Sequence, residues 1–125
     1  ASASAAPIAD RDIAAVAAHA LMTDDLVGCR VQLTGPQALT NTELVAVIGS
    51  VLDRTLTYRE VPPEVVRRRF LGIGLSAAFA DAYMALLAET VDRPALVTGD
   101  VEQILNCPAT AFAQWTTEHR HLFTD

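Results

Sequence analysis

The stretch LTGPQALTNTELVAVIG, residues 33–49, decides how the middle of the chain folds. Its start completes CRVQLTG, in which Val31 and Leu33 alternate with polar neighbours, as in a short strand. The dipeptide Gly35-Pro36 ends that strand. Thr40 then stands three residues before Glu43, which is the spacing of a capping box, so a helix is predicted from this point to about residue 52.

A strand that turns on glycine into a helix is also a common place for a nucleotide phosphate. The dinucleotide fingerprint requires three glycines, whereas here Gly35 stands alone and is followed by Pro36, which has no N–H group. A Walker loop requires a Gly-Lys pair, and the nine basic residues of the chain are all arginine. We therefore interpret the stretch as a structural turn.

A second strand is predicted after the helix, in DRTLTYREV. Two strands joined by one helix form a right-handed parallel crossover, so the predicted fold is α/β with a small parallel strand pair, about 30–34 and 56–61. A parallel pair is unusual by itself because parallel sheets have both faces covered. The pattern resembles one end of a larger α/β sheet.

Apolar spacing and capping residues predict further helices on both sides of this unit, five or six in all. Pro62-Pro63 opens one of them, Ser76 caps a long one that reaches about Val91, and Thr110 caps the last. The others are predicted over residues 10–23 and 101–105. The helix after Ser76 is apolar almost all round, so we expect it to be deeply buried or covered by a partner.

Composition limits the possible partners. The chain has 125 residues, 51% of them hydrophobic, and a formal charge of −6, which argues against general binding of nucleic acid or anionic membranes. The longest apolar run, Leu75–Ala88, is too short to span a bilayer and is interrupted by Asp81. Residues 1–7 are expected to be a disordered lead-in or a cloning remnant, and 8–125 a single domain. Cys29 and Cys107 follow no disulfide or metal pattern, so free thiols and a cytoplasmic location are expected.

The titratable residues give few candidates for catalysis. The three histidines stand at helix ends without a neighbouring acid or cysteine that would complete a metal site, so no metal is expected. Arg67, Arg68 and Arg69 would fan out around a helix, either pairing with nearby acids such as Asp81 or meeting an anionic ligand or partner. Asp81 interrupts an apolar helix, where an uncompensated charge is costly, so it requires a partner, solvent or a role. We take Asp81 and Tyr83 as the candidate catalytic residues.

A small-molecule pocket is the other candidate. Its expected walls are aromatic and flexible apolar side chains on the two helices that follow residue 62. The predicted substrate-binding residues are Phe70, Phe79, Tyr83, Met84 and Leu87. Tyr83 would supply the orienting hydroxyl, and the alternative is that all five are ordinary core residues.

The order of these segments resembles the C-terminal half of NmrA-like proteins, which are atypical short-chain dehydrogenase/reductase relatives with an NAD(P)-binding Rossmann domain. The resemblance covers nearly everything from residue 7 onward. It rests on the combination of RDIAAVAA, LTGPQALTNTE and VPPE with the closing FAQWTTEH. It implies that 30–34 and 56–61 are late strands and that the helices after VPPE form the substrate lobe.

The departures from the family limit the expected chemistry. The glycine-rich dinucleotide loop belongs to an N-terminal half that this sequence does not contain. The Tyr-x-x-x-Lys couple of the wider superfamily requires a lysine, so neither Tyr58 nor Tyr83 can form it. Independent redox activity is therefore not expected, and NAD(P) would bind only if a Rossmann partner completed the chain.

Three functions remain open from the sequence. The first is a substrate-binding lobe or accessory part of an NAD(P)-dependent reductase-like protein. The second is a stand-alone protein or non-redox enzyme that binds an apolar metabolite. The third is a protein-interaction domain. In each case exposed apolar surface is expected to be covered, either in a homodimer or by a Rossmann-type subunit.

Overall fold

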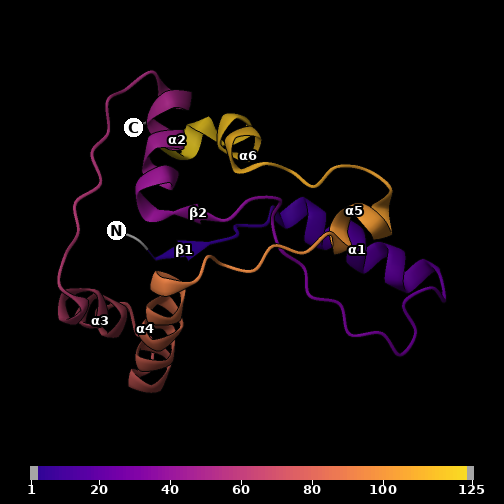
Figure 1. The fold of residues 1–125 in the computed structure, drawn as a ribbon, viewed down its shortest axis with the longest axis horizontal. Helices are drawn as coiled ribbons and strands as arrows, with labels where there is room; N and C mark the ends of the chain where they lie inside the picture. Colours follow the sequence, from indigo (N-terminus) through magenta and orange to yellow (C-terminus); the bar gives the residue numbers. More distant parts are fainter. Residues whose placement is uncertain (1–2, 124–125) are drawn as a thin grey trace.

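The computed structural model describes residues 3–123, which form three pairs of helices around a short ribbon of two strands (Figure 1). The elements in chain order are β1 (Ser4–Ala5), α1 (Asp10–Met22), β2 (Leu39–Thr40), α2 (Asn41–Leu52), α3 (Pro63–Gly72), α4 (Ala77–Asp92), α5 (Asp100–Leu105), α6 (Phe112–Glu118) and the 3-10 helix η1 (Arg120–Phe123). Helix α1 packs against α5, α2 against α6, and α3 against α4. The prediction of five or six helices is therefore confirmed, with six α-helices among the described residues.

Capping residues or a proline account for the starts of three of the six α-helices. The capping box of α2 is present, because the Glu43 N–H donates to Thr40 Oγ1 at 3.2 Å while the Thr40 N–H donates to the Glu43 carboxylate at 2.7 Å. These bonds from Thr40 hold the pKa of Glu43 below its ordinary value. Pro63 opens α3, and the Ser76 hydroxyl caps α4 by accepting the Phe79 N–H at 3.1 Å. The predicted cap by Thr110 is wrong, because Ala111 is the N-cap of α6.

The predicted parallel strand pair is wrong. The only ladder among the described residues is antiparallel and joins β1 to β2, with Ser4 opposite Thr40. Residues 30–34 instead run beside residues 95–100, where Thr98 Oγ1 donates to the Gln32 carbonyl at 2.6 Å and the Thr98 N–H donates to Thr34 Oγ1 at 2.9 Å. Residues 56–61 form part of the long connection from α2 to α3 (Figure 1). Nothing in the described chain covers both faces of a parallel pair, as such a pair requires.

The N-terminal segment is part of the fold. Residues 1–7 were expected to be disordered, but Ser4 is buried and Ser4–Ala5 form β1; residues 1 and 2 lie outside the described residues. The Ser4 N–H donates to Thr90 Oγ1 at 3.1 Å, and Ser4 Oγ accepts the Ala95 N–H at 2.8 Å. These bonds tie the C-terminal end of α4 to the β ribbon. A sequence of small residues therefore folds here because distant backbone groups pair with it.

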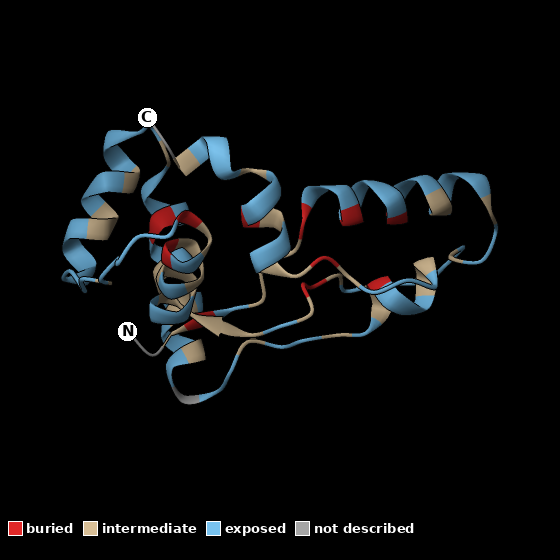
Figure 2. Ribbon diagram, turned by 90° about the horizontal axis from the view of Figure 1, so that it is seen from above, coloured by how far each residue is buried: buried red, intermediate tan, exposed pale blue. Residues whose placement is uncertain are grey.

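The apolar core is small for a chain of this composition (Figure 2). Only five apolar residues among those described are buried: Ala9, Val16, Leu52, Ala80 and Val101. The accessible surface is 8618 Å², whereas a compact monomer of 13.3 kDa would expose roughly 6,500 Å². Helix α4 contributes to this excess, since Phe79 and Leu86 are 48% and 57% exposed. Deep burial of α4 is therefore not achieved within this chain, and its outer face is left open.

Candidate functional site

A large hollow among the described residues lies between α3, α4 and the connection from α2. It is an open groove of about 760 Å³, a size typical of small-molecule sites. It is lined by Ala3, Asn41, Tyr58, Val61, Pro63, Val66, Phe70, Tyr83, Met84, Ala85, Leu87, Ala88 and Val91. Tyr58 and Val61 of the extended segment 54–62 form one wall, and the Pro62-Pro63 pair that follows fixes where α3 begins.

Aromatic rings make the groove rigid at one end. Phe70 and Tyr83 meet edge to face with ring centroids 5.2 Å apart, which is a favourable geometry for two aromatic quadrupoles. Phe79 stacks on Tyr83 at 6.2 Å and meets Phe70 edge to face at 6.1 Å. The three rings hold α3 against α4, so the walls of the groove are supported from behind.

Four of the five predicted substrate-binding residues line the groove: Phe70, Tyr83, Met84 and Leu87. Phe79 does not line it and acts as a support for the other two rings. Their role in binding remains a prediction. Sequence reasoning missed Tyr58 and Asn41, which reach the groove from the connection and from the first turn of α2. The helix-cap pattern placed Asn41 at the start of a helix, but no local signal indicated which cavity that helix end would meet.

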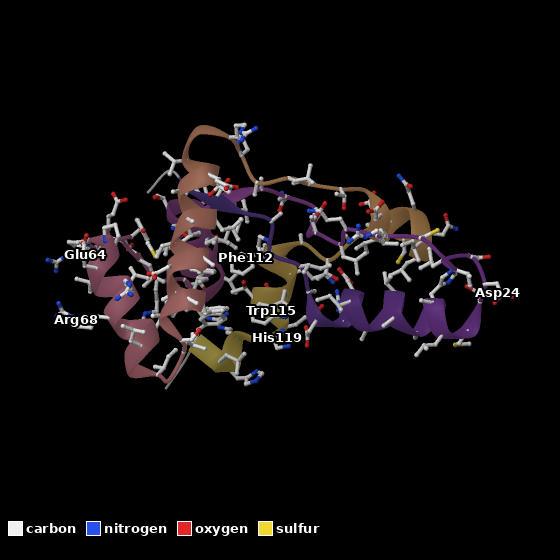
Figure 3. The ribbon with its side chains drawn as sticks, turned by 90° about the horizontal axis from the view of Figure 1, so that it is seen from below. Asp24, Glu64, Arg68, Phe112, Trp115 and His119 are labelled. Atoms are coloured by element: carbon white, nitrogen blue, oxygen red, sulfur yellow. The ribbon has the colours of Figure 1, made fainter. Side chains whose placement is uncertain are left out.

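Asp81 lies outside the groove lining and forms an ion pair with Arg67. Arg67 Nε donates to Asp81 Oδ1 at 2.6 Å, and both side chains are largely exposed. The bond from Arg67 lowers the pKa of Asp81 below its ordinary value. Asp81 is thus a stabilised carboxylate, which suits an ion pair better than proton transfer near neutral pH. The catalytic role of Asp81 remains a prediction, with less geometric support than that of Tyr83. Glu64 and Arg68 also stay outside the groove and project outward from α3 (Figure 3).

A second aromatic cluster lies where α6 meets the start of α1 (Figure 3). Trp115 donates its indole N–H to Asp10 at 3.2 Å and stacks on His119 at 4.4 Å. The bond from Trp115 lowers the pKa of Asp10. The adjoining hollow of about 130 Å³ is small, and its walls include Pro7, Ile8 and Phe112. This cluster joins two helices and offers little room for a ligand.

The Gly35 turn is filled by the chain itself. The Gly35 N–H donates to the Ala6 carbonyl at 3.1 Å, and a Cβ at Gly35 would lie 1.8 Å from the Pro7 carbonyl oxygen. The space that a phosphate would need is thus occupied by backbone. Within the described residues no group of three or more His, Cys, Asp or Glu side chains is arranged for a metal ion. Cys29 and Cys107 are free and exposed.

None of the helices described between residues 3 and 123 is long and apolar enough to cross a membrane. No protein-family model matches the chain.

Two curated proteins are similar in sequence. An NAD(P)H azoreductase of Xenophilus azovorans is 32% identical over 114 residues, covering 90% of this chain and 40% of the relative. A (4-alkanoyl-5-oxo-2,5-dihydrofuran-3-yl)methyl phosphate reductase of Streptomyces griseus is 30% identical over 122 residues, covering 94% of this chain and 43% of the relative. The chain therefore spans about two fifths of the length of the curated relatives it matches.

Solved structures share the fold. The triphenylmethane reductase of a Citrobacter species, complexed with NADP(H), superposes with a TM-score of 0.73 at 16% identity, over 94% of this chain and 41% of that one. An NADPH-dependent quinone oxidoreductase of Escherichia coli gives 0.72 at 22% identity, over 98% and 44%. At these identities the likeness concerns the fold alone.

Proposed function

Because the chain corresponds to the C-terminal part of an NmrA-like, atypical short-chain dehydrogenase/reductase protein, we propose that it is the substrate-binding lobe of an NAD(P)-dependent reductase. The resemblance predicted from the sequence is confirmed, and so is the fold class as a helical lobe of an NmrA-like fold, with an antiparallel strand pair in place of the predicted parallel one. The observation that carries the proposal is the groove between α3 and α4, lined by four of the residues that the sequence marked as a pocket. In this proposal the groove holds the substrate and another part of the reductase holds the nicotinamide.

The chain by itself is not expected to carry out hydride transfer. The Gly35 turn is filled by backbone, and the chain has no lysine to form a Tyr-x-x-x-Lys couple. Tyr83 is the best-placed candidate for a catalytic or orienting hydroxyl, since it lines the groove, whereas Asp81 does not. In this proposal NAD(P) is bound by a separate nucleotide-binding part of the reductase and not by this chain. The proposed location is the cytoplasm, as the sequence predicted.

The exposed surface supports a completing partner. The excess over a compact monomer is about 2,000 Å², more than the roughly 800 Å² per partner of a standard interface. The excess is therefore large enough to include one standard interface. A Rossmann-type part would also supply strands for the extended segments 30–34 and 56–61, and a homodimer is the other candidate.

Native mass spectrometry of the untagged protein from its own cells tests this assembly. We expect a mass equal to this chain plus a Rossmann-sized polypeptide that retains NAD(P). The Rossmann polypeptide can be a separate subunit or can be joined to this chain in one polypeptide. A homodimer that carries an apolar molecule and no nucleotide would favour the stand-alone binding protein instead. A bare monomer would contradict both assemblies.

A charge placed in the groove tests whether it is the binding site. The neutral apolar dye Nile red is expected to bind the chain, and Leu87→Arg is expected to weaken binding at least tenfold, because an unpaired cation in an apolar site is costly. Leu86→Arg is the matched control: Leu86 is the preceding residue on α4, is exposed and lies outside the lining, so binding should be unchanged. Fluorescence titration measures both, with circular dichroism to verify folding. Equal binding by the two variants would place the site elsewhere.

A second candidate is a stand-alone protein that binds an apolar metabolite, favoured by the apolar lining of the same groove. The Streptomyces relative is named for a phosphate ester. A cation for such a group would have to come from outside the described lining, because that lining contains no arginine or histidine.

A further inference from the structure

The groove has a polarity pattern that specifies more than an apolar ligand. Among the described residues that line it, none carries a charge, and the polar side chains are Asn41, Tyr58 and Tyr83. We propose that the groove selects elongated, uncharged molecules that carry a hydrogen-bonding group, such as a carbonyl, at the Asn41 end. This inference rests on the proposed function of the groove as the substrate site.

The length follows from helix geometry. Helix α4 lines the groove from Tyr83 to Val91, and eight residues of α-helix extend about 12 Å. At one end of the groove the Phe70 and Tyr83 rings are in contact, with centroids 5.2 Å apart. A molecule with two linked aromatic rings has a length that matches this part of α4.

The position of Asn41 follows from hydrogen bonds to the N-terminal segment. The Asn41 N–H donates to the Ala3 carbonyl at 3.3 Å, and the adjoining Ser4 N–H donates to Thr90 Oγ1 at 3.1 Å. Asn41 is therefore held near the Thr90 end of α4, opposite the aromatic end. The groove thus has an aromatic end and an amide end.

The polar groups in the lining have unused hydrogen-bonding capacity. Among the described residues, neither the Asn41 side-chain amide nor the Tyr58 hydroxyl forms a hydrogen bond with another described residue. A ligand carbonyl can accept a hydrogen bond from either group. A carboxylate would find no cation in the described lining, so burying its charge there would be costly. The arrangement therefore favours a neutral acceptor over an anion.

Three compounds with the same two-ring body test the inference: biphenyl, 4-acetylbiphenyl and biphenyl-4-carboxylate, each in competition with Nile red. The ketone is expected to bind about fivefold more tightly than biphenyl, the gain typical of one hydrogen bond. The carboxylate is expected to bind at least tenfold more weakly than the ketone. Comparable affinity for carboxylate and ketone would overturn the inference.

The variant Asn41→Leu tests whether the preference for the ketone comes from a hydrogen bond to Asn41 or from the size of the ligand. This variant, of similar volume, should bind biphenyl as before and lose the preference for the ketone. Thr42→Val, at the exposed neighbouring position on α2, is the control and should keep it. A preference that survives in Asn41→Leu would overturn the role of the amide end. If Leu87→Arg weakens Nile red binding but the ketone is not preferred, the groove remains the proposed binding site and only this inference fails. If none of the three compounds binds and Leu87→Arg leaves Nile red binding unchanged, both the inference and the proposed function fail.

Discussion

Gly35→Ala is expected to lower the free energy of unfolding by about 3 kcal/mol, the upper end for added atoms in a well-packed site. The added Cβ would lie 1.8 Å from the Pro7 carbonyl oxygen and 2.7 Å from its carbonyl carbon. Both are backbone atoms, so no side-chain rotation can relieve the clash. The segment that would have to move includes Ala6, whose carbonyl accepts the Gly35 N–H.

Urea denaturation measures this effect, with Gly72→Ala as the matched control. A Cβ at Gly72 would meet no heavy atom within 4 Å, and Gly72 ends helix α3. Alanine is favoured over glycine in a helix, so this control should be neutral or more stable by up to about 1 kcal/mol. A Gly35→Ala protein as stable as the Gly72→Ala protein would show that residues 6 and 7 do not pack against this turn.

Asp12→Ala is expected to cost about 3 kcal/mol, because it leaves a buried backbone donor without a partner. Asp12 lies in the first turn of α1 and is buried, as is Thr110. Its carboxylate accepts the Thr110 N–H at 2.7 Å and the Thr110 hydroxyl at 2.8 Å. Arg11 adds a bond to Thr110 Oγ1 at 2.8 Å, so the start of α1 holds the segment that leads into α6.

The emission of Trp115, the only tryptophan in the chain, provides a local readout. Because Trp115 donates to Asp10 on α1, loosening of α6 should shift its emission toward the red in Asp12→Ala before global unfolding. Asp24→Ala is the control, since Asp24 is exposed and its side chain makes no hydrogen bond with another described residue. A loss of stability below about 1 kcal/mol, with unchanged emission, would contradict the proposed role of this buried carboxylate.

The groove links these structural predictions to function. Its amide end is positioned by the N-terminal segment, which also pairs with β2 and bonds to α4. The Gly35 turn holds the following residues of that segment in place. A variant that loosens the segment should therefore disturb ligand orientation as well as stability, whereas Leu87→Arg acts on the groove alone.

The sequence by itself determined the helices and two of their side-chain caps, because these depend on residues three or four positions apart. The capping box at Thr40 and Glu43 and the Ser76 cap follow from such local geometry. The sequence also determined the family resemblance, which rests on the order of short segments along the chain. It also marked Phe70, Phe79, Tyr83, Met84 and Leu87 as a group, through the substrate lobe that the family resemblance implies, and all of these but Phe79 line the groove.

Only the tertiary structure decided which segments pair and where the polar groups of the groove lie. Residues 30–34 could pair with any extended segment, and the partner is set by contacts with Thr98, more than sixty residues away. The small residues of β1 carry no pattern, and their order comes from bonds to Thr90 and Ala95. Asn41 faces the groove because of that same long-range pairing. Each of these bonds joins a backbone group to a serine or threonine hydroxyl far away in the sequence. Local periodicity carries no information about such contacts, because it reports only on residues a few positions apart.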